Sequence, residues 1–350
     1  MKKVLVSLLV LALAMTSVFA AVDFNGEFVG GYNINYNPAG ASKWSTHIMG
    51  QDGTGSNTTK LNLGFADEDG LWSVTAEGQM VADGRLQGDI KVDLFKLFGL
   101  ENNMSLNLGL SMNDEQSILM AYADKSGNNY DRIRTTGPGL WANLDFKFGD
   151  FVEDLVAGAP KLKTPADDSE TVGQVGGDFT VSAKVTPLNG LAVSAGWVLN
   201  GKDDNGTGTD GLIAAGADVN LADMIGLGFD LGVSASYKYG FGPKQNVVAA
   251  TVYGGVDVVD AFVEYAYLSN DAQHYLMAQV NLNLVENMLL DVFAGAQDLG
   301  DFARTYFVGG DIGYTLSGVT FQLGLEYAAG EAQNYDLTGL SIVPQIKVAF

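Results

Sequence analysis

The sequence predicts an all-β chain that forms a transmembrane antiparallel up-and-down β-barrel. Three observations lead to this prediction. Apolar and polar residues alternate along most of the chain, which is the period of a strand with two unlike faces. Apolar residues make up 47% of the chain, yet none of their runs reaches the roughly 20 residues that a membrane-spanning helix needs. The chain ends on an alternating segment, L-S-I-V-P-Q-I-K-V-A-F (340–350), whose last residue is aromatic.

The first residues predict a secretory signal rather than a part of the fold. Lys2 and Lys3 precede an apolar run from Val4 to Met15, and small residues follow up to Ala20. Basic residues, a short apolar run and a small-residue site are typical of a signal peptide, here cleaved after Ala20. We therefore assign residues 1–20 to the signal and residues 21–350 to a single barrel domain.

The strands of the N-terminal part follow from the alternation. The first covers 22–36, where Phe24 and Phe28 alternate with acidic and amide residues, and a long polar loop follows over 37–56. Short turns then link antiparallel neighbours. Four more strands are expected: one that begins near 59, one that begins near 72, one that includes 90–94, and one over 104–112.

The stretch 113–178 allows two assignments. The alternation over 140–148 is clear, but an even strand count requires a partner for this strand. That partner is either a weak strand before it, at 117–124, or a weak strand after it, at 152–163. We favour the second, because G-D-F-V-E-D-L resembles the later short turns. Residues 113–138 then form one long outer loop, and such a length in a compact domain is usually functional.

The remaining chain is regular, with short turns alternating with longer polar loops. This alternation is typical of barrels whose short turns face one side of a membrane. The expected total is about 18 strands, with 16 as the alternative, and both termini lie at the same, periplasmic rim. The strands expected here are 179–185, 191–199, 212–219, 227–239, 247–255, 261–268, 275–284, 288–296, 305–314, 319–327 and the terminal strand.

Aromatic residues separate a membrane barrel from a soluble β-domain, which also alternates. The strand directions follow from the alternation alone, and they place aromatic rings of the apolar register at the ends of the strands. Two belts of this kind are expected at the two lipid–water interfaces. One belt holds Tyr32, Tyr36, Trp197, Tyr237, Tyr239, Tyr265 and Tyr267, and the other holds Phe65, Phe146, Phe148, Tyr314 and Phe350.

If the apolar register faces lipid, the opposite register lines a lumen. A barrel of this strand number is wide enough to hold an aqueous channel. Acids outnumber bases on the predicted wall, which predicts passive diffusion with a weak preference for cations. The predicted pore-lining charges are Glu27, Lys60, Glu77, Asp89, Lys91, Asp93, Asp145, Lys147, Lys184, Asp230, Lys238, Glu264, Asp291, Asp311, Glu326 and Lys347.

The signal, the strands from end to end, the alternating loop lengths and the terminal Phe350 together resemble the porin superfamily of bacterial outer-membrane proteins, of the general or outer-sheath type. The resemblance implies a place in the outer membrane of a diderm bacterium, in contact with its lipid. It also implies that Ile346, Val348 and Phe350 act as the signal for the barrel-assembly machinery. Porins are often trimers with one loop folded into the lumen, and 113–138 is the candidate for that loop. The sequence departs from the most familiar porin pattern because no arginine is assigned to the lumen.

Other function classes fit the composition less well. The chain holds 41 acidic against 19 basic residues, which argues against nucleic acid as a partner. It has no cysteine and two histidines, His47 and His274. A hydrolase at the outer rim is an alternative that would use His274 beside Asp271, and a surface adhesin or antigen that uses the outer loops is another.

No cofactor, metal site or catalytic residue is predicted. The acids of the glycine-rich loop, Asp203, Asp204 and Asp210, lack a bidentate glutamate at the spacing that a calcium loop needs. A channel specific for sugars would need a track of aromatic rings in its lumen. Phe262, Tyr275, Phe293 and Phe307 are in the inward register, but the sequence does not show that they form a track.

Overall fold

A computed structural model of the chain describes residues 22–38, 42–49, 59–80, 85–100, 104–111, 115–119, 133–136, 139–148, 152–158, 179–199, 211–241, 244–270, 272–329 and 339–350. Between 111 and 184 this description is limited to the backbone. The predicted signal, residues 1–20, lies outside the described residues, so its assignment stays a prediction.

Nearly all of the described chain is strand, and 19 strands form one sheet. β7 and β8 form a separate two-stranded sheet. The strands are β1 (Val22–Tyr36), β2 (Trp44–Ile48), β3 (Thr59–Asp67), β4 (Trp72–Met80), β5 (Arg85–Asp93), β6 (Met104–Ser111), β7 (Glu115–Leu119), β8 (Ile133–Thr136), β9 (Gly139–Phe148), β10 (Val152–Gly158), β11 (Phe179–Leu188), β12 (Leu191–Leu199), β13 (Leu212–Asn220), β14 (Asp230–Gly240), β15 (Gln245–Val256), β16 (Val259–Leu268), β17 (Gln273–Leu282), β18 (Met288–Ala296), β19 (Tyr306–Leu316), β20 (Val319–Ala328) and β21 (Gly339–Ala349).

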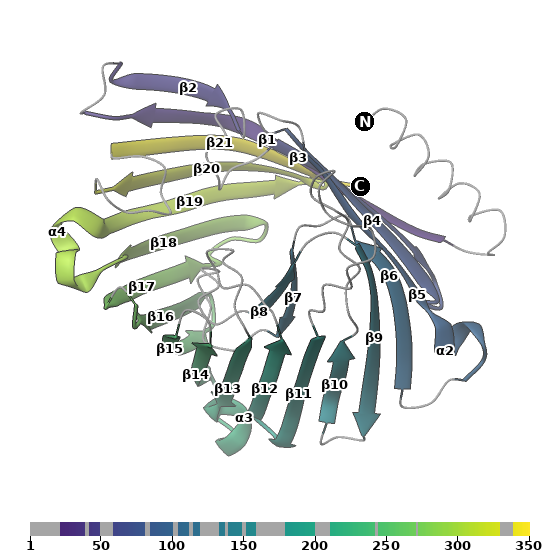
Figure 1. Cartoon of the computed structure of the whole chain (residues 1–350). Helices are drawn as coiled ribbons and strands as arrows, with labels where there is room; N and C mark the ends of the chain where they lie inside the picture. Colours follow the sequence, from purple (N-terminus) through teal and green to yellow (C-terminus); the bar gives the residue numbers. More distant parts are fainter. Residues whose placement is uncertain are drawn as a thin grey trace, which may run out of the picture.

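The first strand, β1, pairs with the last strand, β21, on one side and with β3 on the other. Residues 27–36 of β1 pair with 340–349 of β21, and residues 22–29 pair with 60–67 of β3. The short β2 pairs with the far end of β1. Setting β2 aside, the 19-stranded sheet leaves 18 strands that follow one another around the barrel, which is the larger of the two predicted numbers (Figure 1). The predicted antiparallel up-and-down barrel is confirmed.

The structure decides between the two assignments for 113–178. β9 pairs with β6 on one side and with β10 on the other. β10 in turn pairs with β11. The favoured assignment, with the partner strand after β9, is therefore confirmed. The alternative is wrong, because β7 pairs only with β8 in the separate hairpin.

The connections differ between the two rims. We call the rim where β1 begins and β21 ends the near rim. Turns such as 257–258 and 317–318 link consecutive strands there, and two short helices, α2 (Leu94–Leu97) and α3 (Leu221–Ile225), follow β5 and β13. The strand ends that the longest connections, 112–138 and 159–178, link lie at the opposite rim, which we call the far rim, together with η1 (Leu299–Asp301) and α4 (Phe302–Thr305). The predicted alternation of loop lengths is thus present. None of the helices in the described residues is long and apolar enough to cross a membrane.

The barrel buries polar side chains and exposes apolar ones. On β14, Val233 and Tyr237 are each 40% exposed, whereas Ser234 and Ser236 between them are 0% and 6% exposed. In a soluble domain the apolar face would be the buried one. The same reversal continues on the neighbouring strands, where the exposed apolar side chains include Val248, Val252, Val263, Val280, Val292, Val308, Ile312, Phe321, Leu323 and Leu325.

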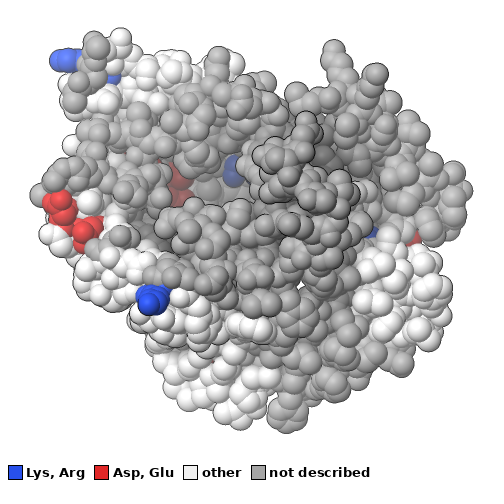
Figure 2. Space-filling model, in the orientation of Figure 1, with Lys and Arg blue, Asp and Glu red and all other residues white. Residues whose placement is uncertain are grey.

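The aromatic belts lie on this outward face. Tyr32, Trp197 and Tyr237 are exposed toward the far rim, and Tyr314 and Phe350 are exposed toward the near rim. The side chains of Phe146 and Phe148 lie outside the described residues. Figure 2 shows that the described surface in this view is largely uncharged, with a few charged atoms at its edge and near its centre.

Candidate functional site

The inner wall of the barrel is the candidate functional site, and strand register organises its side chains. Residues that pair across neighbouring antiparallel strands place their side chains on the same face, about 4.5–5.5 Å apart at Cβ. A residue two positions along each strand belongs to the next row of the same face. The pairing of β14 to β20 therefore divides this part of the wall into rows that run from strand to strand.

One row is rich in carboxylates, and we call it the acidic row. Register places its members opposite one another in sequence from β14 to β20, with glycine as the β15 and β20 members. Its polar members are Asp230, Asp260, Asn281, Asp291 and Asp311. The three predicted pore-lining acids of β14, β18 and β19 thus share a row with Asp260, an aspartate that was not predicted.

The carboxylates of the acidic row have few hydrogen-bond donors around them. Asn220 donates to Asp230 at 3.4 Å, and Asn283 donates to Asp260 at 3.4 Å. The backbone N–H of Asp311 donates to Oδ1 of Asp291 at 3.2 Å. Long or single contacts of this kind compensate little of the negative charge of the row within the described part of the chain.

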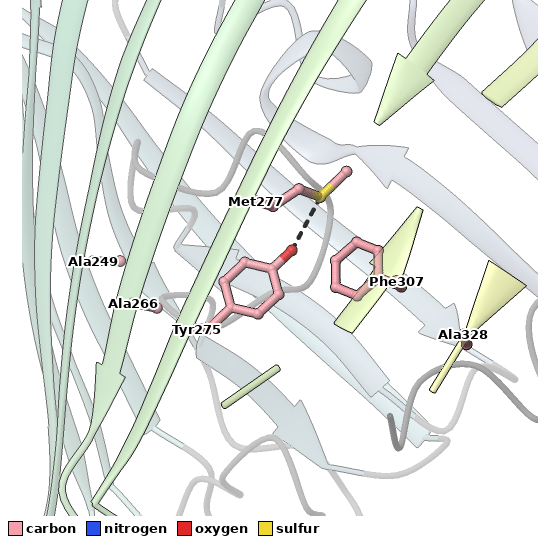
Figure 3. Packing of buried hydrophobic residues seen from close by; sticks show 6 residues of the cluster. All are labelled: Ala249, Ala266, Tyr275, Met277, Phe307 and Ala328. Atoms are coloured by element: carbon pink, nitrogen blue, oxygen red, sulfur yellow. Dashed lines mark hydrogen bonds between the residues drawn. The ribbon is translucent and has the colours of Figure 1, made fainter. Parts of the chain in front are cut away.

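Inward apolar side chains lie farther along the same strands, toward the far rim. Ala249, Ala266, Tyr275, Met277, Phe307 and Ala328 form a buried cluster, shown in Figure 3. The hydroxyl of Tyr275 donates to the sulfur of Met277 at 3.0 Å, and the ring of Tyr275 stacks beside that of Phe307 with centroids 6.4 Å apart. Tyr275 and Phe307 are each only 1% exposed, so these two rings do not line open water.

The opposite wall, on β1, β3 and β4, pairs its charges. Lys60 lies 3.6 Å from Glu77, and Asn62 donates to Glu27 at 3.5 Å. Beside them is a recess of about 320 Å³, lined among others by Asn25, Asn62, Thr75 and Glu77. Because the base faces an acid here, this wall carries less net charge than the wall with the acidic row.

The other predicted pore-lining residues are distributed around the barrel, and their role stays a prediction. The carboxylate of Asp93 accepts hydrogen bonds from the N–H groups of Phe95 and Lys96 at the start of α2, at 2.9 and 3.3 Å. Lys238 and Glu264 are 3% and 1% exposed. Asp89 and Lys91 lie on β5, Glu326 on β20 and Lys347 on β21. The side chains of Asp145, Lys147 and Lys184 lie outside the described residues.

Besides Asp260, a second carboxylate on the inner wall was not predicted from the sequence. Asp218 on β13 accepts a hydrogen bond from Ser234 at 2.5 Å and from the hydroxyl of Tyr253 at 3.0 Å to each carboxylate oxygen. Alanine and glycine occupy both faces of β13 before it. Alternation therefore gave no polar contrast from which the inward face could be recognised.

The described parts of the predicted lumenal loop also have a defined place. β7 and β8, which belong to 113–138, form a hairpin that contacts β11 and β12. Figure 1 shows this hairpin inside the outline of the barrel strands. Among the residues that the structure describes, no group of acids and histidines is arranged to hold a metal ion.

The fold is similar to that of solved porins. The crystal structure of OpdQ from Pseudomonas aeruginosa superposes with a TM-score of 0.56 over 94% of this chain and 96% of that one, at 11% identity. A mutant of the Rh. blastica porin and a structure described as "Asymmetric conductivity of engineered proteins" each reach a TM-score of 0.50, with 11% identity, 94% of this chain and 100% of the other. No family model and no curated protein matches the sequence. The chain thus has the porin-type β-barrel fold.

Proposed function

We propose that this protein is an outer-membrane porin that lets small hydrophilic solutes and ions diffuse passively through a water-filled lumen. The reversed burial of the strands carries the proposal: on β14 the valine and tyrosine face outward, and the serines between them face inward. An exposed apolar wall is stable against lipid tails rather than water. A barrel also pairs its backbone groups, as a bilayer requires.

We assign the selectivity of the pore to the charges of its wall. The sixteen predicted pore-lining charges include ten acids, and three of them lie in the acidic row with Asp260. In a water-filled channel a fixed negative charge raises the local concentration of cations. The expected result is a weak preference for cations that weakens as the salt concentration rises.

The loop over 113–138 is the proposed constriction. The contact of β7 with β11 and β12 supports this proposal, because a hairpin against the inner wall narrows the lumen. The proposal also includes cleavage of the signal after Ala20, recognition of Ile346, Val348 and Phe350 by the assembly machinery, and a homotrimer in the outer membrane. No catalytic function is assigned.

The test is a conductance measurement on the mature chain, residues 21–350, refolded in detergent and inserted into a planar bilayer. The proposal predicts stable open steps in sodium chloride, and a reversal potential in a salt gradient whose sign shows that Na⁺ is more permeant than Cl⁻. A folded barrel that inserts without producing current would contradict the pore. An anion preference would contradict the assignment of selectivity to the wall acids while leaving the pore intact.

A further inference from the structure

A second row of the inner wall carries partly exposed aromatic rings beside the acidic row. Register places Tyr253, Phe262, Gln279 and Phe293 opposite one another on β15, β16, β17 and β18. We call this set the aromatic row. It lies two residues along each strand from the acidic row, toward the far rim. The sequence showed inward phenylalanines but not their alignment, because register between strands is not visible in a single strand.

The rings at both ends of the aromatic row lie over glycines of the neighbouring strands. Gly232 on β14 pairs with Tyr253, and a Cβ atom at Gly232 would overlap the tyrosine ring. Gly309 on β19 pairs with Phe293, and a Cβ atom there would lie 2.5 Å from Cζ of that ring. A ring that occupies the space above a glycine covers the strand with one face. The rings of Tyr253 and Phe293 remain partly exposed, and that of Phe293 also lies 6.3 Å from the ring of Phe307, centroid to centroid.

Carboxylates lie one row away from these rings on the same strands. Asp260 and Phe262 are two residues apart on the inward face of β16, and Asp291 and Phe293 are two residues apart on that of β18. Among the described residues of β13 to β20, Lys238 is the one basic side chain on the inward face, and it lies in a row closer to the far rim. This part of the wall therefore combines aromatic faces with uncompensated negative charge.

We infer that the aromatic row and the acidic row together form a binding strip for small organic cations, that is, solutes with an ammonium or guanidinium group attached to an apolar part. The face of an aromatic ring attracts a cation electrostatically, and the neighbouring carboxylate adds a full negative charge. The apolar part of such a solute rests on the rings. A simple metal cation gains only the electrostatic part, and a neutral polyol gains neither charge interaction. The inference rests on the proposed pore and names a class of solute for it.

The experiment measures how benzyltrimethylammonium chloride reduces the sodium current through the full mature channel. The concentration that halves the current reports binding in the lumen. Phe262→Leu and Phe293→Leu remove a ring face but keep most of the side-chain volume, and each should raise that concentration by about two- to fivefold. Phe321→Leu is the matched control, because Phe321 is 57% exposed on the outward face of β20. It should leave the concentration unchanged.

Each outcome bears on the strip separately from the pore. Equal half-blocking concentrations in the wild type and both inward variants would overturn the inference. A reduction of the current by glucose that the same variants relieve would also overturn it, because it would indicate that the strip binds polyols. Sodium conductance of the unblocked variants shows that they fold and insert. If the wild type passes no sodium current at all, the proposed function fails, and the inference fails with it.

Discussion

Gly26 and Phe350 hold the first and last strands together at the near rim. The N–H of Gly26 donates to the carbonyl oxygen of Phe350 at 2.7 Å, and the N–H of Phe350 donates to the carbonyl oxygen of Gly26 at 2.9 Å. The ring of Phe350 occupies the space that a Cβ atom of Gly26 would need. It also lies 6.0 Å from the ring of Phe24. Phe350 therefore stabilises the junction of β1 and β21 with both its backbone and its side chain.

Replacement of Gly26 by valine should weaken this junction. The new side chain displaces the Phe350 ring, and because that ring is 54% exposed and has space on its solvent side, we expect a loss of about 1 kcal/mol in the free energy of unfolding. Urea unfolding of the barrel in lipid vesicles, followed by tryptophan fluorescence, measures this change. Gly78→Val is the control, because a Cβ atom at Gly78 meets no atom within 4 Å. Equal stability of the two variants would show that the ring does not depend on the glycine.

Neutralising the acidic row should reduce the cation preference. Asp291→Asn and Asp311→Asn each remove one charge, which at roughly 6 Å from a passing ion in water corresponds to about 0.7 kcal/mol, favourable for a cation and unfavourable for an anion, or up to about a tenfold change in the ratio of cation to anion permeability. Reversal potentials in a sodium chloride gradient measure the ratio. The change should be larger at 0.1 M than at 1 M salt, because the Debye length falls from about 10 to about 3 Å.

The control for the acidic row is Asp257→Asn, which makes the same charge change at an exposed turn. Asp257 has a φ of 51°, a conformation that asparagine tolerates well. If this variant alters selectivity as much as the two inward ones, the acidic row has no special part in it.

The ion pair of Lys60 and Glu77 should matter for permeation and not for stability. Their side chains are 36% and 26% exposed, and exposed pairs contribute about 0–1 kcal/mol. Glu77→Gln leaves the charge of Lys60 without its carboxylate, so the single-channel current of Na⁺ should fall while the unfolding midpoint stays within error. The double variant Lys60→Met with Glu77→Gln should restore much of that current. A large loss of stability in the single variant would show that the pair is structural.

The sequence predicted the barrel well because lipid outside and water inside impose opposite demands on alternate residues. That contrast is local, so it located the strands of the barrel wall, including the weak β10. It did not locate β2, β7 and β8, which lie in the predicted loops 37–56 and 113–138. Alignment between strands is not local, because it depends on hydrogen bonds between segments far apart in the chain. The acidic row and the aromatic row were therefore not predicted as rows, although Asp291 and Phe293 were each assigned to the inward face. Asp93 illustrates a further limit: its alternation fits a strand, but its carboxylate is used to begin α2.

Tyr253 and Asp218 offer a test of the network that alternation did not reveal. The phenol donates to both oxygens of a carboxylate two strands away, at 3.0 Å each, and hydrogen bonds to charged groups contribute about 1.5–3 kcal/mol when water is excluded. Tyr253 is partly exposed, so Tyr253→Phe should lower the free energy of unfolding by about 1 kcal/mol. The ring over Gly232 is kept in this variant, and the half-blocking concentration of benzyltrimethylammonium should therefore stay near that of the wild type. A double-mutant cycle with Asp218→Asn separates the pair from its surroundings. Strictly additive losses would show that the hydroxyl and the carboxylate do not stabilise each other.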